Sequence, residues 1–210
     1  MRKQKGYIPW VNTWIYGEDG LPRLLLVGDS IAWGYSVKLD EYLKGKYFVD
    51  RVATAATLDD EYFWKNIDLI LGENEYEVIL FNSGLHGGHL SLSEYEKGIE
   101  KFSLRLKETG ARLIFATTTP YWEGDKIDKV FEPDENGLYV NEGKIGDDCN
   151  KVIQRNKIAL NIMNKYNIEV LDLFSFVNGV VEYRSGDGVH YNEKGWNALA
   201  KEIFEYLNKK

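Results

Sequence analysis

One serine near the start of the chain, with an aspartate and a histidine near its end, has the residue types and spacing for nucleophilic catalysis. Ser30 closely follows an apolar run that ends at Val27, and Asp187 precedes His190 by three residues. A serine hydroxyl is a weak nucleophile at neutral pH, so it needs a histidine to take its proton and a carboxylate to orient that histidine. The three residues can supply these groups if the fold brings them together.

The elements that would position these residues alternate between strands and helices. Near-continuous apolar runs predict strands at Arg23 to Val27, Tyr47 to Ala53, Val78 to Asn82, Arg112 to Thr118 and Glu169 to Phe174. Helical periodicity predicts helices from about Ile31 to Leu43, Ser91 to Thr109, Asn150 to Tyr166 and Glu193 to Asn208. This alternation predicts an α/β protein, a three-layer α/β/α sandwich around a five-stranded parallel sheet.

Three candidate segments lie at the carboxyl ends of predicted strands: Ser30, residues 82–86 and residues 117–120. Ligands of such sheets bind at the carboxyl ends of the strands, so these segments should converge on one rim. A serine at a strand-to-helix turn also offers its own N–H to a developing oxyanion. The alternative is that Ser30 only caps its helix, and that Asp187 and Asn192 only satisfy turn and cap hydrogen bonds.

Length and charge limit the class of protein. We assign the 210 residues to one domain spanning 1–210. A net charge of −7 argues against a nucleic-acid partner, and no apolar run reaches the ~20 residues of a membrane span. The single Cys149 cannot form an intramolecular disulfide, which fits a reducing compartment. We therefore expect a cytoplasmic protein without nucleic-acid or membrane partners, although a removed signal peptide would leave no trace.

The segment 121–148 interrupts the alternation of strands and helices. It has neither helical nor strand periodicity and carries nine acidic residues against three lysines. Loops of this length in compact domains are uncommon and often functional. Because it follows the fourth predicted strand, it could be a lid beside the site or a solvated surface excursion.

Aromatic residues lie close to the predicted strand ends. Trp33, Tyr121 and Trp122 are candidate substrate-binding residues, since aromatic rings can stack on sugars or line an acyl pocket. Trp10, Trp14 and Tyr16 precede the first strand, where they would cover the sheet edge or meet a second subunit.

Four blocks resemble, in the same order, those of the SGNH/GDSL hydrolase family. They read Gly28-Asp29-Ser30-Ile31, Asn82-Ser83-Gly84-Leu85-His86, Thr117-Thr118-Thr119-Pro120 and Asp187-Gly188-Val189-His190. The resemblance spans roughly 23–206, and the Gly-Leu-His sequence is similar to that of a subgroup. It implies a flavodoxin-like sheet and hydrolysis of O-acyl esters without metal or cofactor. It also implies Ser30 as nucleophile, His190 as general base and Asp187 as the residue that orients His190.

The sequence departs from the family at the oxyanion donors. Where the family has a donor glycine after the second strand, this chain has Ala55, whose backbone N–H can still donate. Where the family has a donor asparagine, the chain has His86, whose ring N–H could take its place. Asn82 is the rival donor, or else an amide that ties neighbouring loops together. The predicted oxyanion hole therefore comprises Ser30 and Ala55 with His86 or Asn82.

Metal and nucleotide chemistry find little support in the sequence. His86 and His89 are three residues apart, but no further histidine lies near them in the sequence, since His190 is about 100 positions away. Gly87 and Gly88 also disfavour a helix there. No glycine-rich nucleotide-binding motif is present. We predict no metal and no cofactor.

These observations predict a serine esterase or acylhydrolase. It would cleave short-chain O-acyl esters, with carbohydrate O-acetyl groups among the candidates, so its partner is a small-molecule or carbohydrate ester. Two alternatives stay open: a catalytically silent carbohydrate-binding module of the same fold, and an O-acyltransferase. A homo-oligomer would be compatible with the aromatic residues before the first strand.

Overall fold

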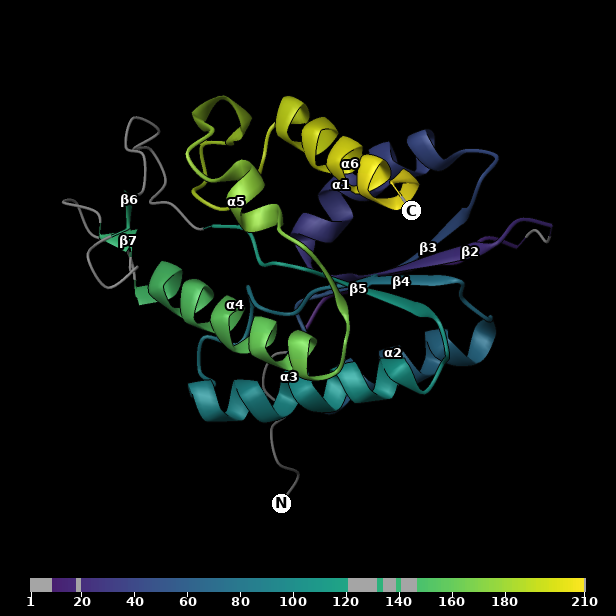
Figure 1. Cartoon of the computed structure of the whole chain (residues 1–210), viewed down its shortest axis with the longest axis horizontal. Coiled ribbons are helices and arrows are strands. Elements are labelled where there is room, and N and C mark those ends of the chain that lie inside the picture. Colours follow the sequence, from purple (N-terminus) through teal and green to yellow (C-terminus); the bar gives the residue numbers. More distant parts are fainter. Residues whose placement is uncertain (1–8, 18–19, 121–131, 134–138, 141–146, 210) are drawn as a thin grey trace, which may run out of the picture.

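A computed structural model describes residues 9–17, 20–120, 132–133, 139–140 and 147–209, with the backbone alone described for 132–133, 139–140 and 147–149. A six-stranded sheet forms its centre (Figure 1). The strand order is β1 (Val11–Trp14), β3 (Phe48–Thr54), β2 (Arg23–Gly28), β4 (Val78–Phe81), β5 (Arg112–Ala116) and β8 (Glu169–Leu171). A separate antiparallel pair is made by β6 (Glu132–Pro133) and β7 (Tyr139–Val140).

The five predicted strands are present and run parallel to one another. The structure adds β1, which pairs antiparallel with β3 so that Val11 lies opposite Thr54. The expected five-stranded parallel sheet is therefore a six-stranded mixed sheet. A strand of four residues, mostly exposed, is too short to give a clear period, which is why the sequence did not reveal it.

Helices cover both faces of the sheet and confirm the three-layer prediction (Figure 1). One layer holds α1 (Ser30–Leu43), α5 (Leu173–Val177) and α6 (Glu193–Asn208), and the other holds α2 (Glu61–Glu73), α3 (Leu92–Lys107) and α4 (Asp147–Lys165). A short 3₁₀ helix, η1 (Val181–Tyr183), precedes α6. Along β2, Leu24 and Leu26 join one apolar cluster while Leu25 and Val27 join the other. This alternation explains the unbroken apolar run, because both faces of the strand are buried.

Three further elements differ from the expectations. α2 is absent from the predicted helices, although its buried Phe63, Ile67 and Ile70 have helical spacing. The predicted strand 169–174 ends at Leu171, because Asp172 caps α5 by accepting a hydrogen bond from the Ser175 N–H at 3.1 Å. Strand β5 likewise ends at Ala116, two residues earlier than predicted.

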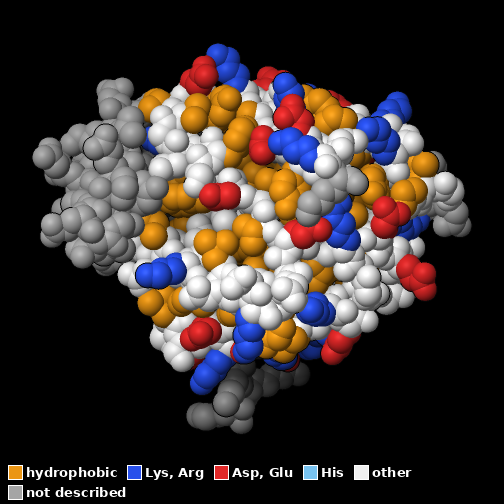
Figure 2. Space-filling model, in the orientation of Figure 1, with side chains coloured by type: hydrophobic (Ala, Val, Ile, Leu, Met, Phe, Trp, Pro, Cys, Tyr) orange, Lys and Arg blue, Asp and Glu red, His pale blue; other side chains and the backbone are white. Residues whose placement is uncertain are grey.

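The predicted acidic loop, 121–148, lies mostly outside the described residues. Its described parts are the strands β6 and β7 and the beginning of α4, so the segment contains some regular structure. On the face shown in Figure 2, acidic and basic side chains are interspersed. Within the described ranges, no helix combines the length and apolar character needed to cross a membrane.

Candidate active site

Ser30 is the first residue of α1, at the turn that follows β2. Asp29 caps this helix, since its Oδ1 accepts a hydrogen bond from the Ile31 N–H at 2.9 Å. The interpretation of Ser30 as the cap is therefore wrong, and its hydroxyl is left for another partner. The turn is close, because a Cβ on Gly28 would lie 2.6 Å from the Ala32 Cβ. The N–H groups that begin a helix favour negative charge beside them.

The structure brings Ser30, His190 and Asp187 together in one hydrogen-bonded row. His190 Nε2 lies 2.8 Å from Ser30 Oγ, across 160 positions of sequence. His190 Nδ1 lies 2.6 Å from Asp187 Oδ2. With a proton on Nδ1, Nε2 is free to accept the serine proton, which is the tautomer that general-base catalysis requires.

Asp187 is held by hydrogen bonds from its own turn. Its Oδ1 accepts from the N–H of Val189 at 2.9 Å and of His190 at 2.8 Å, and the Ser185 hydroxyl lies 2.8 Å away. Burial raises the pKa of Asp187, but hydrogen bonds from the His190 backbone and ring and from Val189 outweigh it and hold the pKa below its usual range. Gly188 adopts φ 81° at this turn, a conformation that favours glycine. Asp187 is therefore ionised at neutral pH.

Close packing of α1 against α6 brings the two halves of this row together. A Cβ on Gly34 would lie 2.5 Å from the Trp196 ring, so glycine is required for α6 to approach α1 this closely. The Trp196 ring lies 6.5 Å from the His190 ring. Asn192 caps α6 by accepting from the Gly195 N–H at 3.1 Å, which sets where the helix begins after His190.

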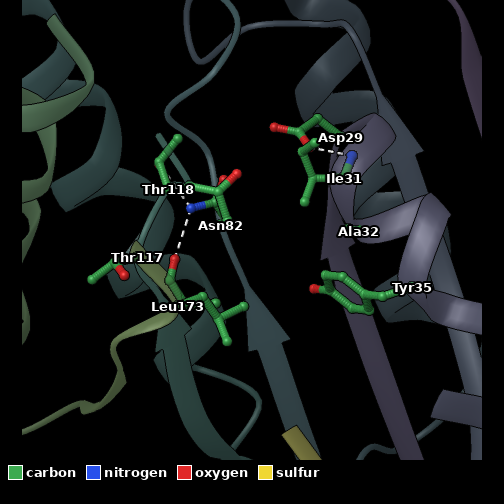
Figure 3. A pocket seen from close by; sticks show the side chains of 10 residues that line it. Asp29, Ile31, Ala32, Tyr35, Asn82, Thr117, Thr118 and Leu173 are labelled. Atoms are coloured by element: carbon green, nitrogen blue, oxygen red, sulfur yellow. Dashed lines mark hydrogen bonds between the residues drawn. The ribbon is translucent and has the colours of Figure 1, made fainter. Parts of the chain in front are cut away.

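Two of the predicted oxyanion donors already have partners. The Ala55 N–H donates to the Trp10 carbonyl at 3.1 Å, a consequence of the β1–β3 pairing that the sequence did not predict. The Asn82 amide donates to the Ala116 carbonyl at 2.7 Å and to Thr118 Oγ1 at 2.9 Å (Figure 3). Asn82 thus ties two strand ends together, as its alternative interpretation stated. Neither group has an N–H left for substrate in this arrangement.

His86 is the third candidate donor, and it differs from the other two. Its Nε2 is buried and, among the described residues, has no hydrogen-bond partner. A cavity of about 10 Å³, which is the size of a single water, lies beside it and is also lined by Asp29 and Asn82. Burial raises the pKa of Asp29, and the nearby His86 partly opposes this rise. A second cavity, of about 20 Å³, lies between Tyr35 and Asn82 (Figure 3).

The loop that carries His86 is fixed by Arg155 of α4. The Arg155 guanidinium donates to the carbonyls of Gly84 at 3.0 Å and His86 at 2.8 Å, and also to that of Gly87. Arg155 is only 2% exposed and packs over the Tyr95 ring at 5.0 Å. A buried guanidinium with three backbone acceptors restrains this loop strongly.

The sequence-predicted site residues do not include Arg155 or its neighbour Asn156. Asn156 pairs with both backbone groups of Thr118, at 2.9 Å and 2.8 Å, so α4 holds two loops of the site. The sequence does contain a pattern that indicates a buried arginine, because Arg155 interrupts the apolar stripe that contains Val152, Ala159 and Ile162. A charge on the buried face of a helix calls for a partner.

Aromatic side chains border the site. Trp33, one turn along α1 from Ser30, is 45% exposed, and its ring lies 6.0 Å from that of Trp10. The Trp10 ring lies 6.3 Å from the His86 ring. The other predicted substrate-binding residues, Tyr121 and Trp122, lie outside the described residues.

His89 does not join His86 in a metal site. Its Nε2 lies 2.9 Å from Asp59 Oδ2 in an exposed pair. Within the described part of the chain, no three His, Cys, Asp or Glu side chains are grouped so that they could hold a metal ion.

Comparison with known proteins places this geometry in a structural class. No protein-family model matches the sequence. A curated relative, PC-esterase domain-containing protein 1B of Rattus norvegicus, is 29% identical over 176 residues, which are 80% of this chain and 39% of that protein. An acetyl xylan esterase structure (AlAXEase) matches with a TM-score of 0.64 and 18% identity, covering 88% of this chain and 99% of the other. A Slackia heliotrinireducens protein assigned to the SGNH hydrolases matches with a TM-score of 0.63 and 19% identity, covering 90% of this chain and all of the other.

The chain has the fold of the SGNH hydrolases, as its ordered sequence blocks suggested. It spans about two fifths of the length of the curated relatives that it matches.

Proposed function

We propose that the protein is a serine-dependent carboxylic ester hydrolase. The observation that carries this proposal is the row of atoms from Ser30 Oγ through His190 to Asp187, with separations of 2.8 and 2.6 Å. Such a row activates a serine that would otherwise be a poor nucleophile. The names of the matched relatives, a PC-esterase domain protein and an acetyl xylan esterase, agree with this chemistry.

The reaction follows from the positions of the three side chains. Ser30 Oγ attacks the ester carbonyl while His190 Nε2 takes its proton, and Asp187 stabilises the resulting imidazolium. The tetrahedral intermediate collapses as His190 returns the proton to the leaving alcohol, which produces an acyl-serine. Water then attacks the acyl group by the same route, and the carboxylic acid leaves with Ser30 restored.

The oxyanion would be stabilised by the Ser30 N–H and by His86. The support for Ser30 is its place at the start of α1, where its N–H has no acceptor within the helix. The support for His86 is its buried Nε2, which has no partner among the described residues and lies beside the cavity of about 10 Å³. For this role Nε2 must carry the proton. We do not assign Ala55 or Asn82 to the hole, because their N–H groups are engaged elsewhere.

Hydrolysis of p-nitrophenyl acetate by the purified protein tests the assignment. The Ser30→Ala variant should lose activity by a factor on the order of 10⁴ to 10⁶, since the nucleophile acts as a unit with its base. His89→Ala is the matched control, because this exposed histidine pairs with Asp59 and should leave the rate unchanged. Equal rates for wild type and Ser30→Ala would overturn the proposal and favour the silent binding module. Ester products formed from added alcohols or sugars would identify acyl transfer.

A further inference from the structure

A hollow of about 230 Å³ lies between β1, β3 and α1, and the contacting rings of Trp10 and Trp33 lie at the end of α1 that is nearer the proposed site. We call this region the aromatic groove and define it by Trp10 and Trp14 on the strand side and Trp33 and Val37 on α1. Three of these side chains are unusually exposed for their size: Trp14 at 54%, Trp33 at 45% and Val37 at 58%. Large apolar groups that gather at the surface mark binding sites more often than scattered ones do.

The two walls of the groove face each other across a polar bridge. Side chains at alternate positions of a strand share a face, so Trp10, Asn12 and Trp14 point the same way. Arg51 of β3 joins that face to α1, because its guanidinium donates to Asn12 Oδ1 at 2.8 and 3.2 Å and also contacts Ser36 Oγ. The Ser36 hydroxyl in turn donates to the Trp33 carbonyl at 2.7 Å.

The groove begins at the proposed active site. Trp33 lies three residues after Ser30, and the Trp10 ring contacts both the Trp33 and the His86 rings. The β1–β3 register, with Val11 opposite Thr54 and Trp14 opposite Arg51, sets the direction in which the groove leaves the site. From Trp10 to Trp14 the strand advances about 13 Å. The far end is the hollow of about 230 Å³, lined by Trp14, Val37 and Arg51, among others.

The chemistry of the groove suits a sugar chain better than a fatty acyl chain. Its walls are mainly tryptophan rings, and its floor carries the Asn12 amide, the Ser36 hydroxyl and the Arg51 guanidinium. Tyr16 and Asp40 add a polar pair at the far end, with the Tyr16 hydroxyl donating to Asp40 Oδ2 at 2.7 Å. A pyranose ring presents an apolar face and a polar edge, which match such walls and such a floor. An alkyl chain would cover these part-buried polar groups without hydrogen-bonding to them, so their remaining hydration would be lost without compensation.

We propose that the aromatic groove binds the glycan chain of an O-acylated oligosaccharide whose ester group reacts at Ser30. This inference rests on the proposed esterase function and names its substrate class. Trp10 and Trp33 hold the sugar that carries the ester, and Trp14 holds a sugar further along the chain. The enzyme should therefore prefer acylated oligosaccharides to acylated monosaccharides.

Rates on a panel of acetylated xylo-, manno-, gluco- and chito-oligosaccharides, from one to six units, test the preference. For the best chain type, kcat/KM should rise with length to at least three units. In Trp14→Ala, the ratio of kcat/KM on that chain to kcat/KM on p-nitrophenyl acetate should fall about tenfold, the cost of losing one buried aromatic contact. Leu69→Ala, which removes an exposed apolar side chain on α2, is the matched control and should keep the ratio. Values of kcat/KM that do not change with chain length would overturn the proposal. So would a loss of kcat/KM in Trp14→Ala that is seen only with p-nitrophenyl octanoate.

Calorimetric titration of the same oligosaccharides into Ser30→Ala separates this proposal from the catalytic one. Binding that weakens about tenfold when Trp14→Ala is added supports the groove even if the wild type hydrolyses nothing. If the wild type hydrolyses p-nitrophenyl acetate but Ser30→Ala binds none of the oligosaccharides, the esterase proposal would hold and the glycan-binding proposal would be wrong.

Discussion

The two sides of Ser30 differ in how completely their hydrogen bonds are satisfied. On one side His190 and Asp187 already form a complete row, with both carboxylate oxygens of Asp187 engaged. On the other side the Ala55 and Asn82 N–H groups are engaged with the backbone or Thr118, and the buried His86 Nε2 is left over. A proton relay can be complete at rest because all its partners belong to the protein. An oxyanion hole must keep its donors unpaired until substrate arrives.

An unpaired buried donor has a cost that the surrounding structure must offset. Such a group costs about 1–3 kcal/mol, so it persists only where other interactions fix its position. Here Arg155 supplies them, since it binds the backbone carbonyl of His86 itself and those of two neighbouring glycines. In the proposed mechanism the two sides therefore have different tasks: proton transfer at His190, and charge stabilisation at His86.

After the loss of Ser30 itself, the largest effect should come from a change that breaks the Ser30–His190–Asp187 row while keeping its shape. Asp187→Asn retains size but removes the charge that stabilises the imidazolium, and it favours the wrong tautomer of His190. We expect kcat to fall by about 10⁴, as measured with p-nitrophenyl acetate. The melting temperature should be recorded in parallel. A loss of less than tenfold in a folded variant would show that Asp187 does not act through His190.

A smaller effect should distinguish the two candidate donors on the other side. His86→Ala should lower kcat by ~10² to 10³ with little change in KM, as expected for loss of one oxyanion donor. Asn82→Ala should act mainly on stability, because its amide ties the ends of β4 and β5 together. The melting temperature should fall while kcat changes little. The opposite pattern, with kcat lost in Asn82→Ala and kept in His86→Ala, would transfer the donor role to Asn82.

The sequence predicted one side of this comparison much better than the other. Ser30 and the Asp187–His190 pair lie in short local motifs at the ends of predicted elements, so chain order and spacing sufficed. The state of the oxyanion donors depends on contacts between distant segments. The Ala55 N–H is engaged only because β1 adds to the sheet edge, and a four-residue strand gives no reliable period. Likewise, the acceptors of Arg155 lie about 70 positions away.

The smallest effect should show that Arg155 acts through His86. Arg155→Met should lower kcat about tenfold in the wild-type background, since contacting residues couple by 0.5–3 kcal/mol. In the His86→Ala background the same change should have less than a twofold effect, because the donor it positions is already gone. Arg155→Lys, which keeps the charge but loses the forked geometry, provides a milder variant if Arg155→Met unfolds. Equal factors in both backgrounds would show that Arg155 supports the fold in general.

Labelling with a fluorophosphonate tests the central claim most directly, because the reagent reacts only with an activated serine. Intact-mass and peptide mass spectrometry should find one adduct per chain, on Ser30, with esterase activity lost in proportion to labelling. Ser30→Ala should remain unlabelled, and Asp187→Asn should react far more slowly. Esterase activity that persists when Ser30 is fully labelled, or an adduct that forms on a different serine as activity is lost, would contradict the account.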